Sequence, residues 1–352
     1  MATIHDVAAL AGVSISSVSN VLNRRTEKMS AQTFSRVEEA IASLGYRPNR
    51  IARQLKTGHT PMLGLLVPST ANPMYGQLAL QIEAAAQARF GYRLLLANTH
   101  RAPEQEARMF EDLLGFGVRS VIVVSSLVDE HHLEQAVASG LSVVSYDGDS
   151  AREPTGAVDH ISPDNYLAGY LAADHLIGHG HRRLAFLVPS GQTVSRASKI
   201  RGFRQRVAEA HAAGGCHGEV IEGIVAQTFG DSELADLGYA MAARVAGMRE
   251  RPSAIVTVND MLALGLLAGL HQAGLRVPQD ISVVGMDGLA MAAFSNPGLT
   301  TVAMPLKTMA ETMVERAVER ALAPSQPPLN LTFEPSLIVR QSVAAPGSAT
   351  EA

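Results

Sequence analysis

The stretch Thr3–Asn23, TIHDVAALAGVSISSVSNVLN, decides the fold of the N-terminal segment. Thr3 followed three positions later by Asp6 is a capping-box pattern, which predicts that a helix begins here. The apolar residues of this first helix recur at helical spacing, and they are Val7, Leu10 and Ala11. Gly12 then predicts the end of the helix and a tight turn.

Two more helices follow in the same segment. Ser14 is placed to cap a second helix over residues 15–22, with Val18, Val21 and Leu22 on its inner face. Ser30 opens a third helix that Gly45 closes. Two short helices joined by a glycine-containing turn, with a third packed behind them, are the helix-turn-helix plan.

The start of the second helix carries side chains that suit base edges. Serine can hydrogen-bond to several bases, asparagine can pair with adenine, and isoleucine can contact a thymine methyl group. These residues are Ser16, Asn20 and Ile15. The alternative is a small three-helix bundle with an ordinary polar surface.

Charge is unevenly distributed along the chain. Residues 1–60 carry eight Lys or Arg and four Asp or Glu, a net charge of +4, although the whole chain of 352 residues is at −4. A basic head on an acidic body indicates a head that binds a polyanion, and an ordinary solvated surface is the alternative.

A short linker follows the third helix. Asn49 is expected to cap about two helical turns that end at Gly58. A helix this short is unstable alone, since about 12 to 15 residues are usually needed, so we expect it to form only against a partner. Its apolar side is Ile51, Ala52 and Leu55, and its basic residues are Arg50, Arg53 and Lys56. A protease-sensitive interdomain tether is the alternative.

From Met62 onward, apolar strand-like runs alternate with helical patterns. The expected strands are Leu63–Val67, Arg93–Ala97, Ser120–Val124, Ser142–Tyr146, Leu184–Val188, Ala254–Val258 and Ile281–Val284. The expected helices are Pro73–Phe90, Pro103–Phe116, Asp129–Ser139, Asp164–Gly178, Ser195–Ala213, Asp231–Met248, Asp260–Ala273 and Leu306–Ala323. This alternation predicts parallel sheets covered by helices on both faces.

The number of strands indicates two open sheets, hence an α/β body of two doubly wound lobes. The expected domains are a head over residues 1–47, a hinge over 48–60, a two-lobed body over 61–342 and a disordered tail over 343–352. Within the body, residues 61–161 and 291–323 are assigned to the N-lobe, and residues 162–290 and 324–342 to the C-lobe.

Doubly wound sheets bind ligands at the carboxyl ends of their strands, so the residues that follow the strands are candidates for a site between the lobes. Carboxylates, an amide, a cation and an aromatic ring gather there, which suits a polyhydroxylated ligand such as a sugar. The candidates are Ser69, Met74, Tyr75, Asp147, Ser195, Lys199, Phe229, Asn259 and Asp287. Asp164, Asp231 and Asp260 are expected to be helix caps instead.

The head sequence resembles the lactose-repressor (LacI/GalR) family of bacterial transcription regulators. So does SLGYRPNRIARQLKTG at residues 43–58, and the resemblance continues over about residues 2–342. It implies that the body is of periplasmic-binding-protein type and binds a small effector. It also implies that paired hinge helices enter the minor groove at the operator centre, where Leu55 wedges between base pairs.

The resemblance and the helix positions together give the expected DNA-binding residues. They are Thr3, Ser14, Ile15, Ser16, Ser19, Asn20, Asn23, Tyr46, Asn49, Arg53, Leu55 and Lys56. The family usually has arginine where Lys199 stands, and lysine is a flexible point charge without the planar fork of arginine. Arg196 and Arg201 flank this position and are candidates to compensate.

Motifs of several enzyme classes are missing from the sequence. It contains no P-loop, no Gly-x-Gly-x-x-Gly after a strand, no Gly-x-Ser-x-Gly and no His-Glu-x-x-His. Its one cysteine, Cys216, excludes an internal disulfide framework and indicates a cytosolic compartment. The group His175, His179 and His181 looks like a helix end, so neither a metal nor a cofactor is expected. No apolar run reaches the ~18 residues of a membrane span.

These observations predict a cytoplasmic, homodimeric regulator, which is not an enzyme and binds an inverted-repeat operator. It is expected to be a repressor controlled by a small effector, most simply a sugar, although an activator of the same family is an alternative. A secreted solute-binding protein would leave the basic head unexplained. A sugar-handling enzyme would need catalytic residues that the sequence does not present.

Overall fold

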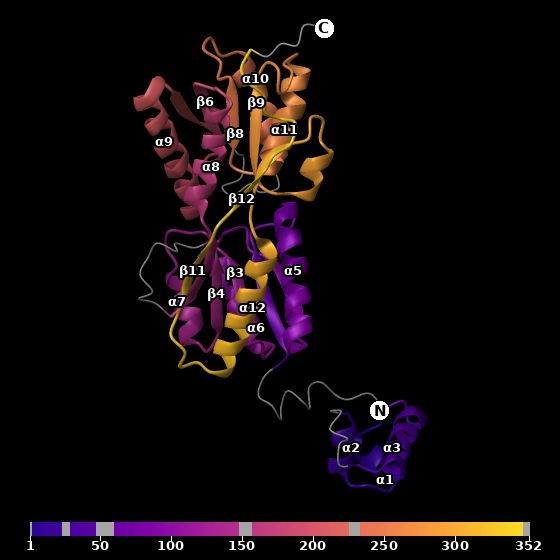
Figure 1. The fold of residues 1–352 in the computed structure, drawn as a ribbon. Coiled ribbons are helices and arrows are strands. Elements are labelled where there is room, and N and C mark those ends of the chain that lie inside the picture. The colour runs from indigo at the N-terminus through magenta and orange to yellow at the C-terminus, as the bar shows by residue number, and fades with distance from the viewer. Residues whose placement is uncertain (1, 23–28, 47–59, 148–156, 225–232, 348–352) are drawn as a thin grey trace. The chain divides into compact units, whose positions relative to one another are not determined.

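The computed structural model describes residues 2–22, 29–46, 60–147, 157–224 and 233–347 (Figure 1). The chain divides into two compact units, Met1–Thr60 and Pro61–Ala352. We call the first unit the head and the second the body.

The described residues of the head form three helices, α1 (Ile4–Ala11), α2 (Ile15–Leu22) and α3 (Ala31–Ser43). The capping box at the start of α1 is present, because the Thr3 and Asp6 side chains each bond to the other's backbone N–H. Gly12 ends α1 at φ +62°, a left-handed conformation that favours glycine. The Ser14 hydroxyl accepts from Ser17 N, and Ser30 caps α3. The helix-turn-helix prediction is therefore confirmed.

The apolar core of the head differs in one residue from the expected stripe. Its buried members are Val7, Ala8, Ala11, Val18, Val21, Val37 and Ala40. Leu10, predicted to face inward, is 56% exposed. The small Ala8 takes the inner position because α1 packs closely against α3, and a larger side chain would hold the two helices apart.

The described residues of the body form two six-stranded sheets, each packed against helices. The first has the strand order β11-β5-β4-β3-β1-β2, and all of its strands are parallel. Its strands are β1 (Met62–Val67), β2 (Arg93–Asn98), β3 (Ser120–Val124), β4 (Ser142–Tyr146), β5 (Asp159–Pro163) and β11 (Asn330–Phe333). Its helices are α5 (Pro73–Phe90), α6 (Pro103–Gly115), α7 (His131–Ala138) and α12 (Leu306–Leu322). This sheet and its helices form the first lobe.

The second sheet has the corresponding order β12-β10-β9-β8-β6-β7, in which β12 alone among the described strands runs antiparallel to its neighbour. Its strands are β6 (Arg183–Pro189), β7 (His217–Gly223), β8 (Ala254–Thr257), β9 (Ser282–Asp287), β10 (Thr300–Ala303) and β12 (Ser336–Ile338). Its helices are α8 (Asn165–Gly178), α9 (Val194–Gly214), α10 (Leu234–Ala246) and α11 (Asp260–Gln272), and the short 3-10 helix η2 (Ala290–Phe294) follows β9. Together they form the second lobe. The prediction of two doubly wound lobes is confirmed.

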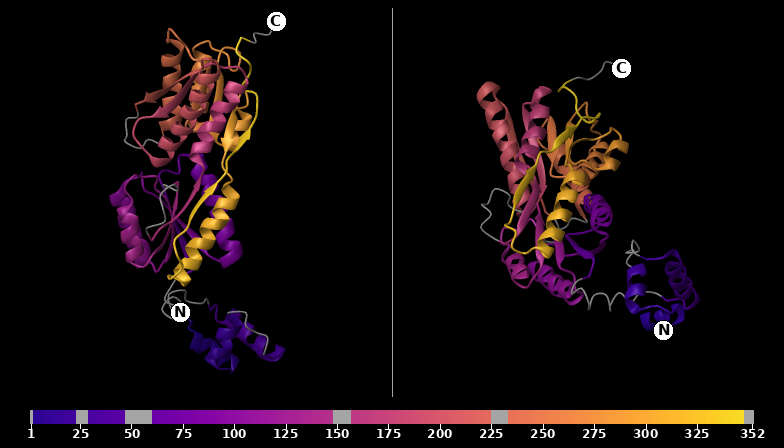
Figure 2. Two further views of the ribbon diagram at one scale, coloured as in Figure 1. Left: turned by 60° about the vertical axis from the view of Figure 1, so that its left-hand side comes forward. Right: turned by 60° about the horizontal axis from the view of Figure 1, so that its bottom comes forward.

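Alternation of side chains along the strands explains why helices cover both faces of the first sheet. Leu63 and Leu65 of β1 pack in one core with α5 and α12, whereas Leu66 packs in a second core with α6 and α7. Figure 2 shows α12, from late in the chain, lying on the first lobe, where it packs against α5. The chain therefore crosses between the lobes more than once.

The crossing points correct the expected lobe boundaries. The chain leaves the first lobe after β5, returns after β10, and crosses again between β11 and β12. Residues 300–303 therefore belong to the second lobe and residues 330–333 to the first, the reverse of the prediction. The reason is edge pairing: β11 covers the open edge of β5, and β12 covers that of β10. Strands of three or four residues carry too little hydrophobic pattern to be assigned from sequence.

Helices α8 and α9 make a close contact through two glycines. A Cβ atom on Gly169 would lie 1.9 Å from Lys199 O, and one on Gly202 would lie 1.9 Å from Tyr166 O. No larger side chain fits at either position without moving backbone. This contact fixes α9, with Lys199, against the start of α8.

The C-terminal tail is ordered further than expected. Residues from 343 were predicted to be disordered, but Val343 packs against the core and Ala344 N donates to Ser282 Oγ. Ala344 O lies 2.9 Å from Nε2 of buried His181, whose Nδ1 lies 2.9 Å from Ser253 Oγ. A carbonyl only accepts, so Nε2 carries the proton and Nδ1 of the neutral ring accepts from Ser253. The disorder prediction was wrong for these residues, because their polar groups find partners beside β9.

This histidine predicts a pH dependence of stability. Burial lowers the pKa of His181 from its ordinary value of 6.5. A lowered folded-state pKa gives stability that is complete above pH ~6.5 and falls as the pH drops, because the unfolded chain takes up the proton more readily. We expect His181→Asn to lower the free energy of unfolding at pH 7.5. We also expect the free energy of unfolding of this variant to fall less steeply between pH 7.5 and 5 than that of the wild type.

Denaturant unfolding at a series of pH values tests this, with His271→Asn at an exposed histidine as the matched control. An unchanged slope of stability against pH in His181→Asn would contradict the assignment of a neutral, buried ring.

Candidate functional site

The head presents one polar helix surface to solvent. Ile15, Ser16 and Asn20 are exposed on α2, and Ile15 is 41% exposed although it is apolar. Val18 and Val21, on the other side of α2, are buried against α3. The three residues predicted to touch bases therefore share the exposed side of α2, as major-groove reading requires.

The other predicted DNA-binding residues divide into three groups. Thr3 and Ser14 are exposed, and their hydroxyls cap α1 and α2. Ser19 is half-buried on α2, and Tyr46 packs against the head core. Asn23, Asn49, Arg53, Leu55 and Lys56 lie outside the described residues.

In the body, hydrogen bonds join the carboxyl ends of the two sheets. Ser126, which follows β3, lies 2.8 Å through its Oγ from Oγ of Ser195 at the start of α9. Asp147, which follows β4, accepts through Oδ1 from Asn165 Nδ2 of α8 at 2.7 Å. We call these two pairs the inter-lobe seam. The first pair joins a strand end of the first lobe to a helix start of the second, and the second pair holds the crossover from β5 into α8 against the end of β4.

A cluster of tyrosines and carboxylates lies beside the seam. Burial raises the pKa of the Tyr146 hydroxyl well above its ordinary value of 10.0, and nearby Asp147, Asp287 and Tyr75 raise it further. Asp147 and Asp287 belong to different lobes, so we name these four residues the strand-end cluster. Three of the nine predicted effector residues, Tyr75, Asp147 and Asp287, thus lie near Tyr146.

A cation adjoins this cluster. Arg101, which follows β2, is buried and donates through Nη2 to Tyr75 Oη at 2.7 Å. The site therefore combines carboxylates, phenols and a guanidinium, which offer both acceptors and donors to a hydroxyl-rich ligand.

Lys199 and Asn259 lie at the strand ends of the second lobe. Lys199 is buried, and its Nζ donates to Val258 O, which follows β8, at 3.3 Å. The Asn259 side-chain oxygen caps α11 by accepting from Leu262 N, which leaves its amide nitrogen to other partners. Arg196 donates to the carbonyls of Pro189 and Ser190, and Arg201 donates to Ser198.

Asp260 does not have the predicted role of a helix cap. Its carboxylate accepts from Thr301 Oγ1 at 2.6 Å and from Leu289 N at 2.7 Å, while the cap of α11 is Asn259. Burial raises the pKa of Asp260 to about 7. By holding the turn after β9, Asp260 positions Asp287, whose φ is +119°.

The remaining predicted positions have local or unresolved roles. The Ser69 hydroxyl accepts from Ala71 N within its own turn, and Met74, in the first turn of α5, is buried in the core. Asp164 caps α8 as predicted. Phe229 and Asp231 lie outside the described residues.

Three contact residues were missed by sequence reasoning: Arg101, Ser126 and Asn165. Arg101 and Ser126 both have φ +53°, a conformation that their residue types do not predict. Asn165 comes directly after the predicted cap Asp164, and that signal was interpreted only as a helix start. The rule that polar residues after strands face the site could have identified Arg101 and Ser126.

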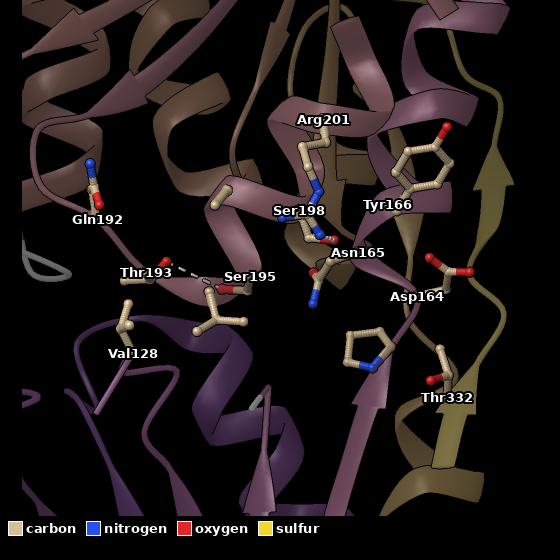
Figure 3. Close-up of a pocket in the computed structure, with 13 residues that line it drawn as sticks. Val128, Asp164, Asn165, Tyr166, Gln192, Thr193, Ser195, Ser198, Arg201 and Thr332 are labelled. Atoms are coloured by element: carbon tan, nitrogen blue, oxygen red, sulfur yellow. Dashed lines mark hydrogen bonds between the residues drawn. The ribbon is translucent and has the colours of Figure 1, made fainter. Parts of the chain in front are cut away.

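A cavity of about 530 Å³ opens beside the seam (Figure 3). Its described lining residues are Val128, Pro163, Asp164, Asn165, Tyr166, Gln192, Thr193, Val194, Ser195, Ala197, Ser198, Arg201 and Thr332. Ser195 is the one predicted effector residue among them.

The described residues also bear on metal and membrane binding. The His175 and His179 rings lie 4.4 Å apart, centroid to centroid, in a tilted arrangement at the end of α8, and His179 Nδ1 lies 2.8 Å from His175 O. Across residues 2–22, 29–46, 60–147, 157–224 and 233–347, no group of three or more His, Cys, Asp or Glu side chains is arranged to hold a metal ion. No helix in the described part of the chain has the length and apolar character needed to cross a membrane.

Known proteins match both units of the chain. The family model described as "Bacterial regulatory proteins, lacI family" matches residues 3–49, and the "Periplasmic binding protein-like domain" matches residues 173–343. The transcriptional regulator DegA of Bacillus subtilis (strain 168) is 31% identical over 346 residues, which are 97% of this chain and 98% of DegA. The transcriptional repressor PurR of Aliivibrio fischeri (strain MJ11) is 32% identical over 317 residues, which are 89% of each chain.

Solved structures agree. The lac repressor dimer bound to operator and the anti-inducer ONPF is 25% identical, with a TM-score of 0.82 over 98% of this chain and 99% of that one. The regulator CelR in complex with cellobiose is 28% identical, with a TM-score of 0.69 over 97% of this chain and 100% of that one. The chain therefore belongs to the lacI family of bacterial regulatory proteins, and is a helix-turn-helix DNA-binding transcription regulator with a periplasmic-binding-protein-like body.

Proposed function

We propose that the protein is a cytoplasmic, homodimeric repressor that binds an inverted-repeat operator. In this proposal, a small effector held between the lobes sets the operator affinity, and the effector is a sugar or sugar derivative. The observation that carries the effector half is the strand-end cluster, where Asp147 and Asp287 of different lobes lie near enough to buried Tyr146 to raise the pKa of its hydroxyl.

Backbone geometry supports a binding role for this cluster. Asp147 has φ +67° and Asp287 has φ +119°, both in the region that non-glycine residues rarely adopt. Such conformations cost about 1–3 kcal/mol and are concentrated at functional sites. Asp147 follows β4 and Asp287 ends β9, so the strained residues put two carboxylates at the carboxyl ends of strands in different lobes.

The chemistry of the cluster favours a hydroxyl-rich ligand. Carboxylates accept hydrogen bonds from hydroxyl groups, and Arg101, Lys199 and the Asn259 amide nitrogen can donate to them. CelR, whose structure holds cellobiose, has the same fold over nearly the whole chain. The cation at 199 is a lysine, which suits a single hydrogen bond better than a bidentate contact.

The DNA-binding half of the proposal rests on the head and on the hinge. The exposed residues of α2 would read base edges in the major groove, and the basic residues of the first 60 positions would neutralise phosphates. Leu55 in the hinge, outside the described residues, is proposed to wedge into the minor groove. The boundaries of 1–47 for the head and 48–60 for the hinge belong to this proposal.

Dimerisation would cover apolar side chains that the body exposes. Leu80 of α5 and Leu96 of β2 are 63% and 40% exposed on the first lobe, and Phe294 of η2 is 89% exposed on the second. Apolar surface of this kind marks interaction sites. Two copies would place two heads on the two half-sites of an inverted repeat, since operator symmetry mirrors protein symmetry.

The proposed mechanism is linkage between two sites. An effector that fits one arrangement of the lobes better than another favours that arrangement, and the arrangement sets how the two hinges meet the operator. A repressor is preferred to an activator because PurR relatives carry the name of repressor. A reporter gene that is silenced, and not stimulated, by the protein on its operator would support this choice.

Substitutions on α2 test whether this helix contacts base edges of the operator. Ser16→Ala and Asn20→Ala remove base-edge contacts and should change which base is preferred at the contacted positions, by about 1–3 kcal/mol for a lost bidentate pair. The measurement is fluorescence anisotropy on a DNA fragment selected by the wild-type protein and on its single-base variants.

The control is Gln32→Ala on exposed α3, which should leave base preference unchanged. A uniform loss of affinity for all fragments, with no change of preference, would refute direct reading by α2.

The Asp287→Asn substitution tests the effector site. A thermal-shift screen with sugars, nucleosides and their phosphates identifies a ligand of the wild-type protein. Losing a charged acceptor costs about 1.5–3 kcal/mol, so the variant should bind that ligand roughly tenfold to a hundredfold more weakly while still binding DNA. Asp112→Asn, at an exposed carboxylate of α6, is the control. Equal ligand affinity in Asp287→Asn and the wild type would remove Asp287 from the site.

A further inference from the structure

The cavity beside the seam is a separate space from the strand-end cluster. Val128, Pro163 and Thr332 line it from the first lobe, and the first turns of α8 and α9 line it from the second (Figure 3). Its volume of about 530 Å³ lies within the ~300–1,000 Å³ of small-molecule sites. None of Tyr75, Tyr146, Asp147 and Asp287 is among its described lining residues.

Asn165 gives this cavity an unused acceptor. The Asn165 side chain is 6% exposed, and its Nδ2 donates to the Asp147 carboxylate, which can only accept. This bond fixes the orientation of the Asn165 amide, because Nδ2 must face Asp147. The amide oxygen, Oδ1, therefore points away from Asp147. Among the described residues, Asn165 Oδ1 has no hydrogen-bond partner. A buried carbonyl without a donor costs free energy, which a ligand hydroxyl would recover.

A cation and a hydroxyl lie next to this acceptor. Arg201 donates from Nη2 to Ser198 Oγ at 3.2 Å, and Figure 3 shows its side chain reaching along α9 toward Ser198 and Asn165. A guanidinium has five N–H donors, so most of them remain for a ligand. Asp164, the carboxylate among the described lining residues, is occupied as the cap of α8 through Leu167 N. The described lining therefore holds one carboxylate engaged at its own helix start and one guanidinium whose free N–H groups can donate to an anionic group.

We propose that this cavity is a second small-molecule site, and that it takes an anionic polyol such as a sugar acid or a sugar phosphate. A ligand hydroxyl donates to Asn165 Oδ1, while the anionic group accepts from Arg201 and Ser198. Gln192, Tyr166 and Thr332 also line the cavity. The walls come from both lobes, so the occupant binds one arrangement of the lobes in preference to others.

The seam couples this site to the strand-end cluster. Asn165 holds Asp147 with one end of its amide and meets the ligand with the other. Occupancy of the cavity therefore orients a carboxylate of the cluster. This coupling rests on the proposed effector function, but the existence of the second site does not.

Calorimetric titration of the full chain tests the site with three probes: D-gluconate, glucose 6-phosphate and neutral glucose. We expect one of the two anions to bind the wild type more tightly than glucose does, and which one binds distinguishes a carboxylate from a phosphate. Arg201→Gln should weaken that binding at least tenfold. Arg204→Gln, at an exposed arginine three residues further along α9, is the matched control and should leave it unchanged.

Asp287→Asn separates this proposal from the effector site, because anion binding in the cavity should survive that substitution. The proposal is overturned if neither anion binds, if glucose binds as tightly as both anions, or if Arg201→Gln binds the anion as the wild type does. It is also overturned if Asp287→Asn abolishes anion binding, because the probe then occupies the strand-end cluster.

Discussion

The body depends on the polar seam that joins the carboxyl ends of its two sheets. Apolar cores stabilise each lobe, but hydrophobic packing is non-directional. The Ser126–Ser195 and Asp147–Asn165 bonds are directional, and they involve largely buried groups that lose much if left without a partner. These pairs therefore favour discrete arrangements of the lobes over a continuous range. The proposed switch between arrangements of the lobes would use contacts of this kind.

The seam also explains the positions of the site residues. Parallel strands end at one edge of each sheet, so both sheets present loops and helix starts where they face one another. The strained turn at Asp287 is held in place by Asp260 through Leu289 N, so buried polar groups of the second lobe support the site from behind. Close glycine packing of α8 on α9 then fixes Lys199 and Asn165 relative to each other.

Sequence reasoning predicted the elements whose signals are local. The capping box at Thr3, the turn at Gly12 and the long helices such as α5 follow from residue type and periodicity. The predictions from sequence were wrong where contacts between distant segments determine the position of an element. Strand β11 belongs to the first lobe because it pairs with β5. The sequence of its four residues does not indicate which strand it pairs with.

The candidate site was predicted in part for the same reason. Asp147, Asp287 and Tyr75 were identified because they follow strands, and the structure brings them together around Tyr146. Arg101 and Ser126 escaped because their left-handed backbone is imposed by the surrounding fold. Asn165 was not predicted as a site residue because its position at the start of a helix already explained it. In the structure it also donates a hydrogen bond to Asp147.

The central claim is that the seam controls the DNA-binding activity of the protein. The direct measurement is a double-mutant cycle with Ser126→Ala and Ser195→Ala, read as affinity for a DNA fragment selected by the wild-type chain. The account predicts that each variant changes operator affinity although the head is untouched, with a coupling of about 0.5–1.5 kcal/mol between them. Wild-type operator affinity in both single variants and in the double variant would contradict it.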